Sequence, residues 1–141
     1  MSDLKLTPDY ITGFVDGEGC FHCSIVFVRC MKLQRRPIPE FVVAQHKRSI
    51  HILYALQDWF QCGLVKHNNG ERFCFCVRNI VHLSEIIVPF FELTPLKIKH
   101  NEFIVFKEIV QMMKSKQHLT ISGLTTIDKL SQSLRVLKRI T

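Results

Sequence analysis

Hydrophobic and polar positions along the chain follow two periods, and each period predicts one kind of element. Apolar residues at steps of three and four, as in the run 50–60, predict an amphipathic helix. The last part of the chain has the same spacing, so we expect a final helix whose apolar face carries Leu124, Ile127, Leu130, Leu134 and Leu137. Further helices are expected at about 8–16, 79–93 and 101–114.

The starts of two helices carry recognisable capping signals. In Thr7-Pro8-Asp9, a hydroxyl N-cap, a proline at the first helical position and an acid in the first turn all favour helix initiation. This first helix should end near Asp16, in the glycine-rich run DGEG. Ser49 is a second hydroxyl that predicts an N-cap, and Gly63 follows the end of that helix as a C-terminal cap region requires.

Residues typical of strands occur in two pairs of runs. The run 21–32 is rich in valine, isoleucine and phenylalanine and predicts a strand, which the segment 33–39 should break before a second strand at 40–47. The run 64–79 predicts a hairpin with Asn68-Asn69-Gly70 as its turn. The predicted order is α-β-β-α-β-β-α with one or two added helices, which defines an α+β fold with an antiparallel sheet.

Each predicted strand has one apolar and one more polar face. In the second hairpin, Phe73, Phe75 and Val77 alternate with Arg72, Cys74, Cys76 and Arg78. In the first strand the apolar face carries Phe21, Cys23, Ile25 and Phe27, and the other face carries His22, Ser24, Val26, Val28, Cys30 and Lys32. If helices cover the apolar faces, the uncovered face fits a DNA major groove, which admits a β-ribbon. The same pattern is also typical of a sheet face that is simply solvated, so both interpretations stay open.

Composition narrows the class of protein. With 141 residues, 47% hydrophobic and 22% charged, the chain fits a single globular domain spanning residues 1–141. Its net charge of +7 favours a polyanionic partner, either nucleic acid or an anionic membrane surface. No uncharged apolar run is long enough to span a membrane and the N-terminus has no secretion signal, so we expect an intracellular protein without a membrane partner.

The cysteines raise the question of a metal site. We expect all six as free thiols in a reducing compartment. Cys20 and Cys23 have the CxxC spacing of zinc ligands, but residues three apart on a strand point to opposite faces. Cys74 and Cys76 share a face, yet no second CxxC or HxxxH pair completes four ligands. The sequence therefore disfavours structural zinc.

Glycines inside the first predicted helix need an explanation. Gly13 lies mid-helix, where glycine costs about 1 kcal/mol relative to alanine. Gly13 and Gly17 lie one turn apart on one face, with the small Thr12 beside them, so a second backbone can approach closely there. A symmetric pair of such helices would bring together two Glu18 carboxylates. Two carboxylates can hold divalent cations that one holds poorly.

The run ITGFVDGEG, residues 11–19, resembles the motif that names the LAGLIDADG homing endonucleases. The runs FVVAQHKRSIHIL, DWFQCGLV, ELTPLKIKHNEFIVFKEIV and HLTISGL are also similar to single-motif members, in the same order and spacing. The resemblance covers about residues 7–135. It implies a homodimer whose motif helices pack at the two-fold axis through Gly13, Gly17 and Thr12. It also implies that each subunit's sheet contacts half of a long, pseudo-palindromic double-stranded DNA site.

The resemblance also implies which residues form the active site. Glu18, the last acid of the motif, would bind the catalytic Mg²⁺, joined by the backbone carbonyl of Gly17. Gln45 would help to position the attacking water. Lys99, with Lys97 as the alternative, would neutralise charge near the scissile phosphate. A further basic position falls on one of three residues that the resemblance does not separate: Lys47, Arg48 or Ser49.

The DNA contacts follow from the uncovered sheet face. Bidentate contacts from side chains such as arginine on guanine discriminate bases in the major groove. The residues expected to contact DNA are His22, Ser24, Lys32, Arg36, Glu40, Lys66, Asn68, Arg72, Cys74 and Arg78. Arg135, Lys138 and Arg139 of the final helix are expected to lie away from this sheet and at most to contact phosphates.

The function implied is that of a magnesium-dependent, site-specific DNA endonuclease encoded by a mobile intron. It would cut both strands across the minor groove and leave short 3′ overhangs. Two alternatives have the same fold: an RNA maturase that assists splicing of its host intron RNA, and a non-catalytic DNA-binding module. The intact Glu18 disfavours the module. The compartment is either an organelle (chloroplast or mitochondrion) or a prokaryotic cytoplasm.

Overall fold

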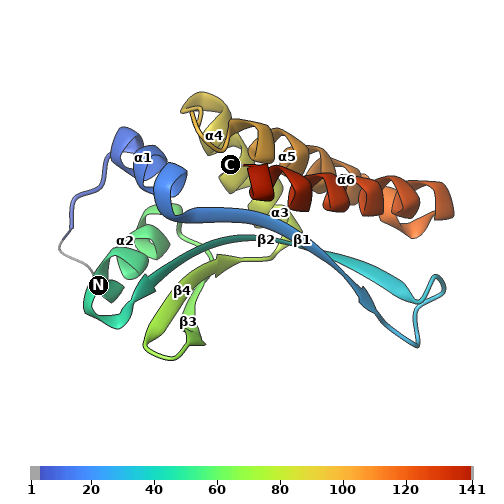
Figure 1. Ribbon diagram of the computed structural model, residues 1–141, viewed down its shortest axis with the longest axis horizontal. Helices are drawn as coiled ribbons and strands as arrows, with labels where there is room; N and C mark the ends of the chain where they lie inside the picture. Colours follow the sequence, from blue (N-terminus) through green and yellow to red (C-terminus); the bar gives the residue numbers. More distant parts are fainter. Residues whose placement is uncertain (1–3, 141) are drawn as a thin grey trace.

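The chain folds into a four-stranded antiparallel sheet with helices on one face, as a computed structural model describes it for residues 4–140 (Figure 1). The elements in chain order are α1 (Pro8–Glu18), β1 (Gly19–Phe27), β2 (Arg35–His46), α2 (Ile50–Phe60), β3 (Leu64–Asn69), β4 (Arg72–Val77), α3 (Ile80–His82), α4 (Val88–Leu93), α5 (His100–Lys114) and α6 (Ile121–Ile140). A π turn at Leu83–Ile87 joins α3 to α4, and short 3₁₀ turns lie at Lys47–Ser49 and Gln117–Leu119. The predicted fold class and order of elements are confirmed.

The strands follow the order β1-β2-β4-β3, so β1 and β3 form the two edges of the sheet. Gly19 lies opposite Val43, and Phe41 lies opposite Val77. Directly opposed residues point to the same side of a sheet. The large apolar residues of β1, β2 and β4 therefore gather on one face. The other face is uncovered and curved into a hollow (Figure 1).

The first hairpin differs from the prediction. The segment 33–39 does not break the strand, because residues 35–40 belong to β2 and pair with residues 22–27 of β1. Pro37 and Pro39 fit there because β4 pairs only with residues 41–46. Their missing N–H groups face the open edge of β2, where no ladder hydrogen bond is lost. β1 ends earlier than predicted, so Lys32 lies in the exposed turn of the hairpin.

The second hairpin turns one residue later than predicted. Asn69 lies opposite Arg72, so Gly70 and Glu71 form a two-residue turn, and Gly70 has a positive φ of 57°. Asn68 lies at an irregularity in the pairing between His67 and Asn69. The turn therefore places the left-handed backbone on glycine, which adopts it without strain.

One predicted helix cap is confirmed and the other is wrong. The Thr7 hydroxyl accepts a hydrogen bond from the Tyr10 N–H at 3.2 Å and caps α1. Ser49 makes no side-chain cap for α2 within the described part of the chain. The 3₁₀ turn before α2 moves the cap back to His46, whose Nδ1 accepts from the Arg48 N–H at 3.1 Å.

The core lies between the sheet and the helices and is rich in phenylalanine. Phe21 of β1 contacts Phe41 of β2 at a ring-centroid distance of 5.3 Å, and it meets Phe106 of α5 at 5.2 Å. Phe75 of β4 and Phe91 of α4 are also fully buried. These rings join the middle of the sheet to α4 and α5, so the sheet surface on the opposite side is held rigidly in shape.

Helix α6 lies beside α5 and covers the edge strand β1 (Figure 1). Ile127 packs with Cys23 of β1 in a second small apolar cluster, and the predicted apolar face of this helix is confirmed by the burial of Leu124 and Leu134. The Ser131 hydroxyl donates to the Cys23 carbonyl at 2.6 Å and satisfies a backbone acceptor on the sheet edge. No helix in residues 4–140 is both long and apolar enough to cross a membrane.

Candidate active site and nucleic-acid interface

The junction between α1 and β1 places Glu18 and Gly17 on the surface. Glu18 is the last residue of α1, and both it and Gly17 are exposed. Gly19 follows, and its backbone N–H donates to the Val15 carbonyl. A Cβ on Gly19 would lie 2.7 Å from a Val15 methyl, so only glycine allows the chain to turn directly from helix into strand here.

Asp16 ties this junction to the segment before α5. Its carboxylate accepts hydrogen bonds from the backbone N–H groups of Lys97 and Ile98 at 3.0 Å and of Lys99 at 2.9 Å. Partial burial acts to raise the pKa of Asp16, but these backbone hydrogen bonds outweigh it and hold the pKa below its ordinary value. The carboxylate is therefore ionised at neutral pH and clamps the start of α5 onto α1.

The clamp brings the Lys99 ammonium to the end of α1. Its Nζ donates to the Gly19 carbonyl at 2.6 Å and approaches the Val15 carbonyl at 3.4 Å. Lys97, the alternative, contributes its backbone N–H to the clamp and is exposed. The ammonium of Lys99 therefore lies at the carbonyl end of α1, while Lys97 contributes its backbone N–H to the same clamp.

Gln45 lies at the same end of the sheet. Val43 is opposite Gly19, the first residue of β1, so β2 continues past the start of β1 and carries the half-buried Gln45 about 7 Å further along. Val43 and Gln45 both point to the face of the sheet that carries α1. The structure therefore gathers Glu18, Gln45 and Lys99 from three different segments at one end of the sheet.

The three candidates for the further basic position have different surroundings. The Lys47 ammonium contacts the Glu71 carboxylate at 3.2 Å, which ties it to the turn between β3 and β4. His46 contacts the same carboxylate at 2.9 Å. Ser49 is half-buried at the start of α2, and Arg48 is exposed. Lys47 and Arg48 are thus both exposed cations, and Lys47 has the Glu71 carboxylate as a partner.

The face of α1 that carries its glycines is open. Among residues 4–140, and apart from the adjacent residues and the backbone of α1 itself, no atom lies within 4 Å of a Cβ built on Gly13 or Gly17. Tyr10 stacks on Phe14 on this helix with ring centroids 6.2 Å apart, and Tyr10 is 55% exposed. Thr12 is not on that face: it is 8% exposed, and its hydroxyl donates to the Thr94 carbonyl at 3.3 Å.

Glu40, expected to contact DNA, is instead 7% exposed on the sheet. One carboxylate oxygen accepts from Arg78 Nε at 2.5 Å and from the Cys76 thiol at 3.2 Å, and the other lies 3.1 Å from His22 Nε2. Burial acts to raise the pKa of Glu40, but the hydrogen bonds from Arg78 and Cys76 outweigh it, and the pKa lies below its ordinary value. Both oxygens are engaged inside the protein, so the expected DNA contact by Glu40 is not supported.

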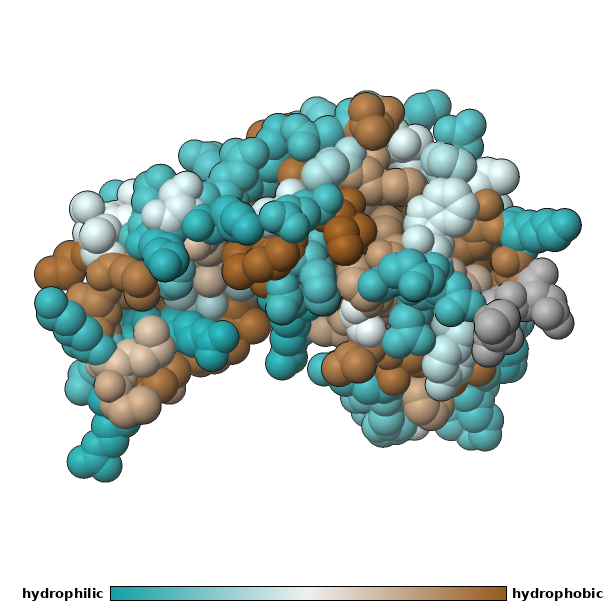
Figure 2. All heavy atoms as spheres, turned by 180° about the vertical axis from the view of Figure 1, so that it is seen from behind, coloured by the Kyte–Doolittle hydropathy of each residue, from teal (hydrophilic) through white to brown (hydrophobic). Residues whose placement is uncertain are grey.

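The other residues expected on this face differ in exposure. Cys74 is only 3% exposed and offers almost no surface. His22 and Ser24 are half-buried on β1. The exposed members of the set are Lys32, Arg36, Lys66, Asn68, Arg72 and Arg78. Figure 2 shows the hollow under the sheet edge-on, with hydrophilic side chains projecting on both sides.

The end of α6 lies closer to this face than predicted. Arg135 and Lys138 line a cavity of about 240 Å³ together with His22 and Ser24 of β1. Partial burial is the main reason that the pKa of His22 lies below its ordinary value, and the positive charge of Lys138 lowers it further. The prediction that the basic residues of the final helix lie away from the sheet is therefore wrong for these two. α6 packs along β1, which its periodicity alone could not indicate.

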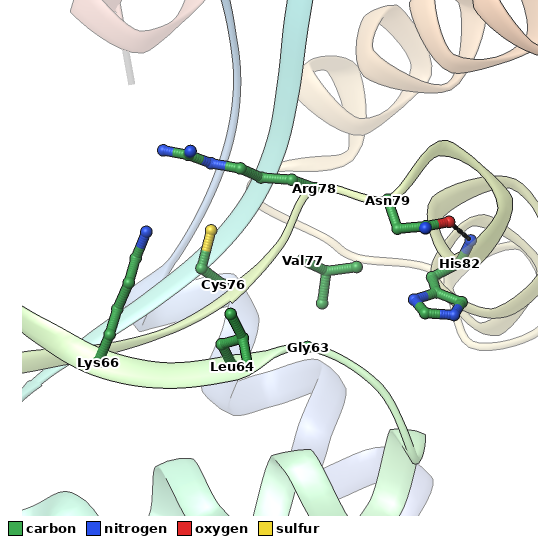
Figure 3. A pocket seen from close by; sticks show the side chains of 8 residues that line it. All are labelled: Gly63, Leu64, Lys66, Cys76, Val77, Arg78, Asn79 and His82. Carbon is green, nitrogen blue, oxygen red and sulfur yellow. Dashed lines mark hydrogen bonds between the residues drawn. The ribbon is translucent and has the colours of Figure 1, made fainter.

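A second cavity, of about 360 Å³, opens beside β3 and β4 (Figure 3). Lys66, Cys76 and Arg78 line it and extend their side chains to the same side of the two strands (Figure 3). At its other end Asn79 accepts backbone hydrogen bonds from Val81 and His82 and caps α3. The cavity is thus cationic on the side of the uncovered sheet face.

Residues 4–140 thus form an α+β fold whose sheet has one uncovered face with exposed basic side chains. Residues 11–110 match the family model described as LAGLIDADG endonuclease, and the chain belongs to this family. A crystal structure of the homing endonuclease I-TnaI is similar, with 40% identity, a TM-score of 0.89 and coverage of 96% of both chains. The structure of I-LtrWI bound to target DNA is also similar, at 32% identity and a TM-score of 0.87, over 93% of this chain and 45% of that one.

Among curated proteins, "Probable intron-encoded endonuclease 2" of Neurospora crassa is 32% identical over 95% of this chain. This chain spans only 29% of the length of that relative. The similarity therefore covers nearly all of this chain but less than a third of that relative.

Proposed function

We propose that this protein is a site-specific homing endonuclease that makes a double-strand break in a long, pseudo-palindromic DNA target. The observation that carries the proposal is the Lys99 ammonium, bound 2.6 Å from the carbonyl of Gly19, the residue that directly follows the exposed Glu18 in the chain. A cation next to an acid at a surface opening suits hydrolysis of a phosphodiester. Two similar proteins, I-TnaI and I-LtrWI, are homing endonucleases, and the second was solved on its target DNA.

Each group at the junction has a distinct chemical role in this proposal. Lys99, held by two carbonyls, places positive charge where the scissile phosphate develops negative charge. Gln45 cannot ionise, so it orients the attacking water through hydrogen bonds rather than acting as a base. Glu18 supplies a carboxylate at the same place. The cleaving unit therefore depends on residues of three segments that the fold brings together.

A divalent cation, which we take to be Mg²⁺, fits the oxygen donors of this site. The Glu18 carboxylate and the Gly17 carbonyl are hard oxygen ligands of the kind that Mg²⁺ prefers. Within residues 4–140, no group of three His, Cys, Asp or Glu side chains is placed to hold a metal ion. One chain therefore offers too few ligands, and a second copy together with DNA phosphates would complete the set. When bound, the cation would supply an activated water and stabilise the leaving oxygen.

We propose that the second copy docks on the open face of α1. The empty space at Gly13 and Gly17 has no explanation within a single chain, where alanine would stabilise the helix. The exposed aromatic side chain of Tyr10 lies on the same helix. Docking two α1 helices there would bring two Glu18 residues together and join two sheets into one long DNA-binding surface.

We further propose that an intron encodes the protein, as the name of the Neurospora crassa relative states for that protein. The DNA of an organelle or a prokaryotic cell would then be its place of action. Host intron RNA stays an alternative partner, because the same basic sheet could bind it. Failure to cut any DNA while binding intron RNA would favour the maturase alternative.

Replacing Glu18 with glutamine tests the proposal. A randomised double-stranded DNA library is cut by the full chain in the presence of Mg²⁺, and the cleaved sequences are recovered. We expect Glu18→Gln to abolish cleavage and to leave DNA affinity within about twofold, since affinity rests on phosphate and groove contacts. Glu108→Gln, the same exchange at an exposed position of α5, is the matched control and should cut normally. Full cleavage by Glu18→Gln would remove Glu18 from the reaction.

A further inference from the structure

Glu40 is the most deeply placed charged group on the uncovered sheet face. It lies on β2 between His22 of β1 and Arg78 beyond the end of β4, and its two oxygens receive three partners. Burial raises the pKa of Cys76 to about 11, so its thiol keeps the proton that it donates to Glu40. Three partners and an exposed fraction of only 7% leave this carboxylate little free capacity and little surface for a hydrogen bond from a base.

Arg78 is held by this network but not covered by it. Its Nε donates to Glu40 at 2.5 Å, while its side chain stays 55% exposed. The hydrogen bond to Glu40 is the main reason that the pKa of Arg78 is raised. Since Nε is engaged, the two terminal nitrogens of the guanidinium form the part that a ligand can reach. Because Glu40 holds it, the long Arg78 side chain has already lost much of its conformational freedom before any ligand binds.

The exposed polar groups next to Arg78 are donors. Lys66 of β3 extends its ammonium to the same side of the strands as the Arg78 guanidinium (Figure 3). Cys76, between them, turns its hydrogen toward Glu40. The nearest acceptor, the Glu40 carboxylate, is buried and engaged. A ligand edge that meets Lys66 and Arg78 therefore encounters two cationic hydrogen-bond donors.

Guanine is the base whose major-groove edge matches such a surface. It presents two adjacent acceptors, O6 and N7, whereas adenine presents one acceptor and one donor, and cytosine presents a donor. The two terminal nitrogens of an arginine match O6 and N7 in a bidentate contact. Resting on the DNA-binding role proposed above, we propose that Arg78 contacts a guanine in the major groove and that Glu40 is the positioning residue that holds it.

The test is a binding selection of the full chain on a randomised double-stranded DNA library. We expect the wild type to enrich guanine at one position of each half-site. Arg78→Ala should reduce that preference by roughly 5- to 150-fold. Glu40→Gln keeps the shape of the side chain but removes its charge, and it should weaken the same preference by about two- to tenfold. The double variant should lose no more than Arg78→Ala alone, because Glu40 acts through Arg78.

Two further variants separate the guanine contact from simple charge. Arg72→Ala removes an arginine from the other end of β4, where its guanidinium approaches the Ala44 carbonyl at 3.4 Å instead of a carboxylate. It should leave the guanine position unchanged. Arg78→Lys keeps the charge but loses the planar fork, so it should weaken the guanine preference while it retains most of the affinity. This variant tests the proposal even if Glu40→Gln does not fold.

Several outcomes would overturn the inference. An even loss of affinity over all sequences in Arg78→Ala, with a flatter salt dependence, would make Arg78 a phosphate contact. A guanine preference that is undiminished in Arg78→Lys, or that is unchanged in Glu40→Gln, would also contradict it. A shift at a different base pair in Glu40→Gln would show that Glu40 contacts a base itself. A wild type that enriches no sequence at all would instead contradict the proposed function.

Discussion

Two cations of this protein, Lys99 and Arg78, are positioned in different ways. Lys99 is held by backbone carbonyls at the end of α1, and its own backbone is held by Asp16. Arg78 is held by the side chain of Glu40 on the sheet. Backbone groups are present whatever the residue, so the junction depends on few side chains. The sheet contact depends on a pair of side chains, either of which can be exchanged without moving a strand.

This difference separates the groups proposed for DNA cleavage from the groups proposed to recognise the DNA sequence. The junction forms wherever α1, β1 and the start of α5 meet, so its geometry follows from the fold. The uncovered sheet face can change its donors and acceptors while the phenylalanine core on the other side stays intact. One scaffold can thus keep a single reaction and contact different DNA sequences.

Blocking the open face of α1 should have the largest effect, because it should prevent two copies of the chain from pairing. Apart from the adjacent residues and the backbone of α1 itself, the Cβ of a leucine at Gly13 meets no atom of residues 4–140 within 4 Å, so Gly13→Leu should fold as a single chain. We expect it to be monomeric and unable to make double-strand breaks. Sedimentation velocity and cleavage assays would measure both effects. Gln132→Leu, which adds the same side chain to an exposed position of α6, is the control. An unchanged dimer in Gly13→Leu would place the interface elsewhere.

Removing the carboxylate of Asp16 should loosen the junction while leaving the sheet face alone. Asp16→Ala leaves three backbone N–H groups without their acceptor, which should lower the free energy of unfolding by about 1–3 kcal/mol. Cleavage should fall about tenfold or more, because Lys99 is no longer fixed. Urea denaturation and single-turnover cleavage would measure these effects. Asp9→Ala, on the same helix, should change stability by at most about 1 kcal/mol. Equal effects of the two variants would contradict the clamp.

Acid should lower the free energy of unfolding in two steps, and two histidines account for the first. Burial lowers the pKa of His22 and of His118 below the ordinary 6.5, so the unfolded chain takes up protons first as pH falls. The free energy of unfolding should therefore decrease below about pH 6.5, at about 1.4 kcal/mol per pH unit for each extra proton that the unfolded chain binds.

The carboxylates titrate in a lower range. Asp16 and Glu40 have folded pKa values below their ordinary 3.8 and 4.5, so their contribution is present above that range and is lost as pH falls through the folded values. Denaturation at a series of pH values would show two successive losses. His22→Gln should reduce the first and leave the second. Stability that increases between pH 7 and pH 5.5 would refute this assignment.

The smallest expected effect concerns the end of α6. Alanine at Lys138 and Arg139 should lower DNA affinity evenly across sequences and reduce the slope of log K against log salt by about one for each phosphate that the variant no longer binds. Lys138 lies close to His22, so a change in base preference near β1 is the outcome that would contradict a purely electrostatic role. A salt titration together with the library selection would distinguish the two.

Local patterns in the sequence were sufficient to locate most of the elements. The start of α1 follows from the capping residues Thr7 and Pro8, and the buried face of α6 follows from apolar spacing. The start of β2 could not be predicted in this way, because Pro37 and Pro39 look like strand breakers in isolation. They are acceptable only because β4 is too short to reach that part of β2. That is a property of the assembled sheet.

The sequence by itself therefore determined the helices and most of the strands, the family, and the residue types available for catalysis. Periodicity and capping act over a few neighbouring residues, and the motif lies within one short run. Only the tertiary structure decided which charged groups meet. Asp16 and Lys99 are 83 residues apart in sequence, and Glu40 and Arg78 are 38 apart. Whether a carboxylate is exposed to DNA or engaged with an arginine depends on the strand paired beside it, and no local pattern contains that information.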